Sequence, residues 1–564
     1  MRQQVTTGVL VIGSGTAGVA AALQCARRGV RVALVGEDRQ LGGMFTAQGV
    51  SACDGNELMG FQTGLWRVFL QELYRRQTTG LHHSWVSFFT FDPRVGEGIF
   101  RDWVQELVPR LLWLPQQQLF EVRRQGDRVT GAVFTDYEIT AQVTIDATEL
   151  GDGLHLGGVP YRWGWETQAI FQEPSAPVVL GELHHKYPVQ ALTWVALLQG
   201  AGGATEIVPS AIFQNTFRQH SPARMLSYGA LTPDLYMVNW PQDGNDYAVD
   251  LDRLVTGVRA DVLAAARAHT RQFITYLQQV FGPDLQPAAF LPGGLAQQPY
   301  YRESRRVVGL KTVTELDILP VAGGRVAALD RDWIAFGNYA NDHHYPGDRW
   351  PVASKATVWG GRWTGTPFGI PYGALVPATV DGLLVTERNI SVSHIANGAT
   401  RLQPLVLNLG QVAGLAAALC VERGLSPHEL PVMDLQFALL TEPTAPAGVV
   451  PFYNLTSQDP RYPALQQAIL QGGPYSPDGQ APVSPTPAVV TGKSYRGTLF
   501  VAGSQSTFAT PELGAVPLVT LEPTVAEFLA NAPAQQEVQV VGIYYPKGVW
   551  FAASAIGEVG IGVC

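Results

Sequence analysis

The sequence predicts an α/β fold built around a doubly wound parallel sheet, with a mixed α/β domain inserted into it and an extension at the C-terminus. Three observations predict this fold. An all-apolar run at residues 9–12 is followed at once by three closely spaced glycines. Strand and helix patterns then alternate. A second helix of small residues is expected much later, at residues 410–418.

Composition narrows the possible functions. The 564 residues carry a net charge of −9 and are 46% apolar, which indicates a folded protein with two or three sub-structures. Dense runs of Lys and Arg are missing from the sequence, so nucleic acid is not expected as a partner. No apolar stretch reaches the roughly 18 to 20 residues of a membrane-spanning helix. We expect a cytoplasmic location, with the periplasm as the alternative.

The cysteines predict neither a metal site nor a disulfide framework. They are widely spaced and form no Cys-x-x-Cys pair, as expected in a reducing compartment. The four are Cys25, Cys53, Cys420 and Cys564.

The first forty residues predict a β-α-β unit that binds a dinucleotide. Gly13, Gly15 and Gly18 form Gly-x-Gly-x-x-Gly directly after the strand at 9–12, with a helix expected at 19–28 and a strand at 30–35. These glycines allow a tight turn, a close approach of the backbone to a pyrophosphate, and close helix packing, as in a Rossmann-like fold. The helix N-terminus, with Thr16 and Ala17, would face the phosphates.

An acidic residue is expected near the end of the second strand to bind a ribose hydroxyl. The strand end falls on Gly36, and the acids come next, so Glu37 is the expected ribose ligand.

The loop after the second strand carries a family resemblance. Gly42 and Gly43, followed by Met44, resemble the second half of the fingerprint of two-dinucleotide-binding-domain flavoproteins. The run through Asp54 resembles the FAD-dependent oxidoreductase family. The resemblance implies FAD as the cofactor, with this loop along the flavin side. A glycine-rich surface loop is the alternative interpretation.

Three strands are expected at 120–124, 128–134 and 139–143, with a turn at 125–127. This meander leads to residues 144–152, which resemble the family's Ala-Thr-Gly segment, although Glu149 stands where a glycine is commoner. The resemblance places five residues of this region near the cofactor: Val122, Ala147, Thr148, Gly151 and Asp152.

A third flavin signature follows residue 380. We expect a strand at 383–385, a loop at 391–401 and the small-residue helix at 410–418. In the family such a helix points its N-terminus at the pyrimidine end of the flavin, which implies that Arg401, Gly410 and Gln411 contact the cofactor. An alanine-rich core helix is the alternative. The sequence holds no second dinucleotide fingerprint, so electrons are expected to come from an organic substrate and to leave to dioxygen, a quinone or a carrier protein.

Residues 153–375 are expected to form the substrate cap. Arg302 and Arg305 suit a carboxylate, because guanidinium groups bind oxygens in pairs. A structural ion-pair face is equally compatible with them. His343, His344 and Tyr345 form the richest acid-base cluster, and one of the two histidines is the expected catalytic base. The alternative is a loop whose polar groups serve its own turns; metal binding is not expected.

The predicted organisation is an FAD-binding domain at 1–152 and 376–425, the cap at 153–375, and a C-terminal extension at 426–564. Residues 452–484 of the extension resemble one S-layer-homology repeat, but a helix and loops packed on the body are expected. The final stretch, residues 538–563, is apolar with glycines and is expected to form strands. The expected reaction is hydride transfer from a small polar or anionic substrate to N5 of FAD. The alternatives are an isomerase-like flavoenzyme without net redox and a non-catalytic, FAD-stabilised scaffold.

Overall fold

The computed structural model describes residues 1–564 except 201–206, 242, 250–252, 255–258, 354–355 and 560–564. Its central sheet has seven strands in the order β3-β2-β1-β6-β5-β4, with β18 paired to β6. β1, β2, β3, β6 and β18 are parallel, while β4 and β5 are antiparallel to their neighbours. The strands are β1 Gln3–Ile12, β2 Val32–Val35, β3 Leu111–Leu114, β4 Leu119–Gln125, β5 Arg128–Phe134, β6 Tyr137–Asp146 and β18 Leu383–Val385.

The predicted β-α-β unit and meander are confirmed. Helix α1 (Thr16–Arg27) joins β1 to β2, which pair in parallel from Val9 with Val32 to Ile12 with Val35. β18 pairs with β6 at Leu383 and Thr144, so the two separated parts of the chain build one sheet. The fold is therefore the predicted α/β architecture.

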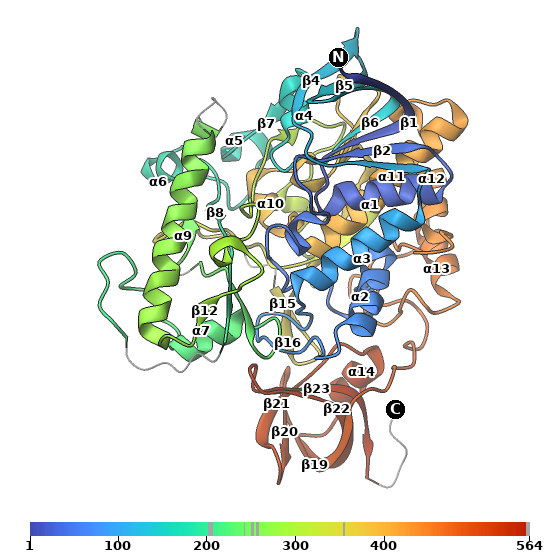
Figure 1. Cartoon of the computed structure of the whole chain (residues 1–564). Helices are drawn as coiled ribbons and strands as arrows, with labels where there is room; N and C mark the ends of the chain where they lie inside the picture. Colours follow the sequence, from blue (N-terminus) through green and yellow to red (C-terminus); the bar gives the residue numbers. More distant parts are fainter. Residues whose placement is uncertain (201–206, 242, 250–252, 255–258, 354–355, 560–564) are drawn as a thin grey trace.

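Helix α11 (Gln403–Arg423) packs across α1 on the same face of the sheet (Figure 1). A Cβ on Gly410 would lie 2.2 Å from the carbonyl oxygen of Ala17, and one on Gly414 would lie 2.3 Å from that of Ala21. The helix is long and apolar enough to cross a membrane, but 94% of its apolar window is buried inside the protein. It is the central core helix, longer than the sequence predicted.

The loop expected at 391–401 is wrong. Residues 394–400 form α10 (His394–Thr400), whose N-cap Ser393 accepts a hydrogen bond from the N–H of Ala396 at 3.0 Å. Such a cap offsets the unsatisfied N–H groups of the first turn, and it stabilises a helix that Gly398 alone would disfavour.

Residues 153–375, the predicted cap, are mixed α/β, with α9 along their outer side (Figure 1). Their small sheets are β10-β9-β12, β11-β8, β13-β7, β14-β17 and β15-β16. The helices are α4 Asp152–Leu156, α5 Gln168–Phe171, α6 Glu182–Lys186, α7 Pro222–Tyr228 and α9 Arg259–Phe281. The strands are β7 Tyr161–Arg162, β8 Leu192–Thr193, β9 Ala196–Gln199, β10 Leu235–Val238, β11 Asp246–Tyr247, β12 Gln286–Pro287, β13 Arg306–Val307, β14 Trp333–Asn338, β15 Ala356–Trp359, β16 Arg362–Gly365 and β17 Pro367–Pro371. Helix α3 (Pro93–Glu106) lies beside α1, and α2 (Gly64–Arg76) packs against α3 and α11.

The C-terminal extension ends in a closed five-stranded barrel, order β19-β20-β21-β23-β22, at the bottom of Figure 1. Before it, α12 (Val432–Leu440), α13 (Tyr462–Leu470) and their loops pack on the body, where Phe452 and Tyr462 join the main core. Strands expected in 538–563 are present, except that 560–563 lie outside the described residues. The barrel consists of β19 Lys493–Ala502, β20 Gln505–Thr510, β21 Gly514–Thr520, α14 Pro523–Asn531, β22 Gln535–Tyr545 and β23 Trp550–Glu558.

Candidate functional site

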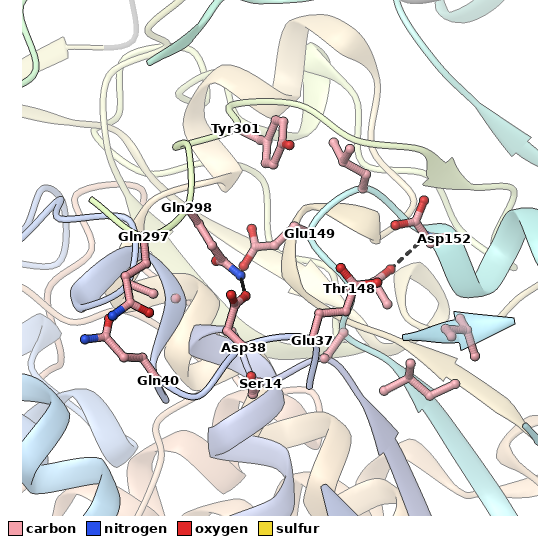
Figure 2. A pocket seen from close by; sticks show the side chains of 18 of the residues that line it. Ser14, Glu37, Asp38, Gln40, Thr148, Glu149, Asp152, Gln297, Gln298 and Tyr301 are labelled. Atoms are coloured by element: carbon pink, nitrogen blue, oxygen red, sulfur yellow. Dashed lines mark hydrogen bonds between the residues drawn. The ribbon is translucent and has the colours of Figure 1, made fainter. Parts of the chain in front are cut away.

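A cavity of about 330 Å³ opens at the carboxyl ends of β1, β2 and β6. Figure 2 shows its polar side chains converging from the β1–α1 turn, the end of β2 and the cap. Seven of the residues predicted to bind the cofactor line it, namely Gly13, Gly15, Glu37, Gly43, Ala147, Thr148 and Asp152. Ligands of α/β proteins bind at this end of a parallel sheet.

The glycines allow backbone segments to meet at distances that a side chain would prevent. Gly13 has φ +108°, and a Cβ there would lie 2.1 Å from the carbonyl oxygen of Ala147. A Cβ on Gly18 would lie 2.0 Å from the carbonyl oxygen of Gly13. A Cβ on Gly43 would lie 2.8 Å from Cα of Gly15, so the two glycine motifs form one cradle. This geometry suits a pyrophosphate.

The loop of the second motif is tied to the first. The N–H of Gly42 donates to the carbonyl oxygen of Ser14 at 3.0 Å, and Oγ1 of Thr16 donates to that of Gly42 at 2.9 Å. Met44 is fully buried in the core with Ala17. These predicted residues support the cradle from behind.

Acidic groups gather at the β2 end of the cavity (Figure 2). Burial and the charge of Asp152 raise the pKa of Glu37, while Arg259 opposes them. Asp152 accepts hydrogen bonds from Arg259 at 2.7 Å and from Arg305 at 3.0 Å. Asp38 accepts one from the side-chain amide of Gln298. Carboxylates here are placed to accept from ribose hydroxyl groups.

Arg305 therefore has another role than the predicted one. Its Nη1 donates to Asp152 and, at 2.7 Å, to the carbonyl oxygen of Leu150, and its guanidinium lies 4.4 Å from the Trp163 ring centre. Gly151, with φ +65°, shapes the turn beside it. Arg305 supports the dinucleotide cavity and does not present a free guanidinium to a substrate.

Three further predicted cofactor residues serve the core. Val122 is buried on β4 and does not line the cavity. Gly410 lets α11 approach α1. The Gln411 amide accepts from the N–H of Leu65 at 2.9 Å and donates to the carbonyl oxygen of Ala445 at 2.7 Å, so it is a structural linker. For α11, the core-helix alternative fits these contacts.

Buried polar atoms without partners continue from the cradle along residues 44–54. Neither amide atom of Gln48, which is fully buried, has a hydrogen-bond partner among the described residues. The same is true of Oε1 of Gln403 and Nε of Arg401. Gln403 meets the loop, since its Nε2 donates to the carbonyl oxygen of Val50 at 3.1 Å. Buried polar atoms of this kind need a partner, so the residues fit a polar heterocycle.

Residues 44–54 end at a second cavity, of about 170 Å³. Burial, followed by the charges of Glu57 and Asp342, raises the pKa of Asp54 to about 8, against the effect of Arg362 and Arg401. The lining residues are Asp54, Gly55, Glu57, Val86, Asn338, Tyr339, Ala340, Arg362, Trp363, Thr364 and Gly365. The surroundings of Asp54 therefore favour the neutral form of its carboxyl group.

Arg362 brings a positive charge to this cavity. Its Nη2 donates to the carbonyl oxygen of Val86 at 3.0 Å, while Nη1 is buried without a partner among the described residues. The guanidinium lies 4.1 Å from the ring centre of Phe88 and 4.9 Å from that of Trp550, which belongs to the C-terminal barrel. Arg362 is thus oriented by aromatic rings and has one unused donor group.

The histidine cluster is assembled, but its nitrogens are occupied. His344 lies between Asp246, 2.6 Å from Nδ1, and Asp342, 2.7 Å from Nε2. Asp342 also pairs with Arg401 at 3.0 Å, and its side chain remains 42% exposed. On the interior side, Asp246 also pairs with the buried guanidinium of Arg302. His344 therefore positions carboxylates and has no free nitrogen for a substrate.

His343 is also engaged. Nε2 lies 3.0 Å from the carbonyl oxygen of Ile395, which can only accept, so Nε2 carries the proton and Nδ1 accepts from the Tyr345 hydroxyl at 3.0 Å. The Tyr345 hydroxyl is also 2.8 Å from Nε2 of His394. Burial and the charge of His394 lower the pKa of His343 to about 3. Both predicted histidines thus use their ring nitrogens in hydrogen bonds within the protein.

Arg302 is a structural residue as well, as the ion-pair alternative expected. Its side chain is 1% exposed and pairs with Asp246 at 3.1 Å. The same guanidinium donates to the carbonyl oxygen of Ala191 and to side-chain oxygens of Thr193 and Asn239. It cannot bind a substrate carboxylate without losing these bonds.

Sequence reasoning therefore missed Asp54 and Arg362. Asp54 does follow directly on the family-like loop, which was the one available signal. In the described part of the chain, no group of three or more His, Cys, Asp and Glu side chains suits a metal. Cys25, Cys53 and Cys420 are free and buried.

Comparison with known protein families gives a match over most of the chain. A family model described as FAD dependent oxidoreductase matches residues 8–439. The search of curated proteins gave no match. Among solved structures, the flavin-dependent brominase Bmp2 is 12% identical, with 74% of this chain and 80% of that chain covered and a TM-score of 0.33.

Two other structures are similar at the same level. A geranylgeranyl bacteriochlorophyll reductase-like protein from Thermoplasma acidophilum is 10% identical, covering 83% of this chain and 88% of that chain, with a TM-score of 0.33. The flavin-dependent monooxygenase PieE, solved with FAD and substrate, is 13% identical over 47% of each chain, with a TM-score of 0.25. These TM-scores are low, so the assignment depends on the family model.

Proposed function

Because the chain belongs to the FAD dependent oxidoreductase family, and is therefore an FAD-binding enzyme, we propose that it oxidises a small polar or anionic organic substrate by hydride transfer to N5 of FAD. When bound, FAD supplies the two-electron acceptor for such a reaction. The substrate is proposed to occupy the cavity beside Asp54 and Arg362.

Different groups of residues are proposed to bind the pyrophosphate, the ribose and the flavin of FAD. The backbone at Gly13, Gly15 and Gly43 would hold the pyrophosphate, and Glu37 would accept from the ribose. The unpartnered amide of Gln48 and the unpartnered Oε1 of Gln403 would meet the polar edge of the flavin. This assignment is supported by the cradle geometry and by the orphaned atoms between the two cavities.

Asp54 carries the proposal. It lines the second cavity, and burial first of all raises its pKa to about 8, close to the pH at which a general base works best. Asp54 would take the proton from a substrate hydroxyl or amine as its neighbouring carbon is oxidised. It replaces His343 and His344 in this role, because their nitrogens are occupied.

Arg362 would orient the substrate. Its buried Nη1 is an unused donor on the cavity wall, and a guanidinium favours carboxylate oxygens. Phe88 and Trp550 hold the group in place, so little conformational freedom is lost on binding. A substrate with a carboxylate or another anionic group near its alcohol or amine fits this arrangement.

The test is anaerobic bleaching of the flavin absorbance. The FAD-loaded protein is mixed with 2-hydroxy acids, amino acids and neutral polyols, and the bleaching rate is followed against pH. We expect an anionic member to bleach the flavin, with a rate that rises through about pH 8 as Asp54 loses its proton. Asp54→Asn should slow bleaching and remove this pH dependence, whereas Glu121→Gln, an exposed matched control, should not.

Other outcomes are equally informative. Bleaching of Asp54→Asn with the rate and pH profile of the native protein would refute the role of Asp54. Conversion of a substrate without bleaching would favour an isomerase-like enzyme. FAD binding with neither effect across the panel would favour the non-catalytic scaffold. Mixing the reduced protein with air-saturated buffer, a soluble quinone or a carrier protein would identify the electron acceptor.

A further inference from the structure

Two carboxylates lie at the N-terminus of α1, where the glycine cradle would receive the pyrophosphate. Oε1 of Glu387 accepts from the N–H of Ala17 at 2.6 Å. A Cβ built on Gly15 would lie 2.7 Å from Oε1 of both Glu149 and Glu387. Negative side chains thus flank the backbone that is to hold negative phosphates.

Glu387 has an unusual conformation for this position. It is 1% exposed and has φ +59°, in the left-handed region that few residues other than glycine adopt. Its second oxygen, Oε2, is buried and makes no hydrogen bond within the described part of the chain. Nη1 of Arg388 lies 3.7 Å from it. Strain and unused hydrogen-bonding capacity together are typical of functional positions.

The charges around Glu387 do not balance a diphosphate. Arg388 is the positive side chain on its own turn, η6 (Glu387–Asn389), and pairs with Glu149 from the loop after β6. α1 offers only its partial positive end, with the N–H groups of Ala17 and Gly18. Of the other packed elements, α11 has no charged residue before Glu422 and Arg423, near its far end, and Arg306 of β13 is bonded to Glu166.

If both glutamates were ionised, a bound diphosphate would lie near two negative carboxylates, and Arg388 would be the one neighbouring side chain, among those that the structure describes, that offsets their charge. Uncompensated buried charge is costly, and a like charge favours the neutral form of a carboxyl group. Protonation of one glutamate removes the conflict. Glu387 is the better candidate, because Arg388 stabilises the anionic form of Glu149 directly.

We propose that Glu387 is a neutral carboxylic acid in the FAD complex, with the proton on its buried Oε2, so that FAD binding is coupled to proton uptake. This inference depends on FAD binding and not on the oxidation proposed above. The protonated Oε2 can then donate a hydrogen bond to a phosphate oxygen, while Oε1 continues to accept the hydrogen bond from the N–H of Ala17.

The pH dependence follows from this assignment. Burial raises the pKa of Glu387 to about 8, although the N–H groups of Ala17 and Gly18 lower it. A bound diphosphate raises it further. FAD affinity is then constant below about pH 8 and falls above it by up to about tenfold per pH unit.

The experiment is calorimetric titration of the apo-protein with FAD, in two buffers of different ionisation enthalpy. Near about pH 9, where free Glu387 is mostly ionised, we expect uptake of close to one proton per FAD, and a Kd up to about tenfold weaker than at about pH 8. Glu387→Gln should bind FAD with neither proton uptake nor this pH dependence. Glu121→Gln, on the exposed face of β4, should behave as the native protein does.

Three results would overturn the inference. They are no proton uptake by the native protein near about pH 9, unchanged uptake in Glu387→Gln, or loss of uptake in Glu149→Gln while Glu387→Gln retains it. If Glu387→Gln does not fold, the native proton count and the Glu149→Gln titration still decide, because the inference requires uptake in both.

Discussion

Gly410→Ala tests whether the crossing of α1 and α11 fixes the FAD cradle. The new Cβ would lie 2.2 Å from the carbonyl oxygen of Ala17 and 2.6 Å from its Cα. Carbon atoms pack well at about 3.5–4.0 Å, so the two helices would have to separate. Ala17 also lies in the first turn of α1, where its N–H donates to Glu387. A shift of this turn would therefore reach the phosphate end of the cavity.

The expected stability change combines two opposing effects. Overpacking a well-filled core costs about 1–3 kcal/mol, whereas replacing a helical glycine by alanine contributes about 0.5–1 kcal/mol of stability. Because an approach of 2.2 Å belongs to the upper end of the overpacking range, Gly410→Ala should destabilise the apo-protein by about 2 kcal/mol and weaken FAD binding. Urea denaturation of the apo-protein and FAD titration measure the two effects separately.

Gly98→Ala is the matched control. Gly98 is also inside a helix, α3, but the only atom within 4 Å of its Cβ position, among the residues described, is Nη1 of Arg76 at 4.0 Å. It should therefore gain about 0.5–1 kcal/mol from helix propensity alone, without a change in FAD affinity. A Gly410→Ala protein as stable as native, with native FAD affinity, would refute the reasoning.

Three further predictions concern the orientation of Arg362 and the buried ion pair of Arg302 and Asp246. Trp550→Ala removes a ring that orients Arg362, so KM for an anionic substrate should rise while the FAD Kd stays unchanged; Phe500→Ala, on an exposed part of the barrel, should change neither. Arg302→Met leaves the buried Asp246 without its arginine, with His344 and Thr193 as its remaining partners, and should lower the free energy of unfolding by about 3–5 kcal/mol; unaltered stability in urea would contradict the structural role. Although burial opposes them, Arg302, His344 and Thr193 together lower the pKa of Asp246 to about 2, so this carboxylate stabilises the fold above its unfolded pKa, and about 2 kcal/mol is lost as the pH falls toward 2. Asp246→Asn should flatten that part of the acid-unfolding curve, and an unchanged curve would disprove the assignment.

Local patterns predicted the cofactor half of the fold. The strand, glycine turn and helix at the N-terminus, and the meander that ends in β6, each lie within a continuous segment whose periodicity and turn residues are visible in the sequence. The pairing of β18 with β6 could be expected because the family resemblance covered both segments. α10 was missed even though Ser393 is a favourable N-cap; the helix is short and contains a glycine at 398, which lowers its intrinsic helix propensity.

The substrate half could not be predicted in the same way, because its chemistry depends on contacts between distant segments. Arg302 and Arg305 are three residues apart in the sequence, but their carboxylate partners come from distant segments. Asp246 begins β11, and Asp152 begins α4. Charge type alone does not distinguish an occupied guanidinium from a free one. The barrel also contributes Trp550 to the wall around Arg362, which no pattern in the C-terminal extension indicates.

Asp54, which lines the second cavity, and Asp342, whose charge acts on Asp54, differ in a way that supports separate roles. Enclosure by protein alone would raise the pKa of Asp342, but the charges of His344 and Arg401 bring it well below its usual range. Asp342 therefore stays anionic and contributes to the raised pKa of Asp54, after burial and Glu57. Carboxyl groups whose surroundings separate their pKa values commonly divide the work of acid-base catalysis. Asp54 is therefore the proposed proton acceptor, and Asp342, held by His344, is one of the charges that raise its pKa, after burial and Glu57.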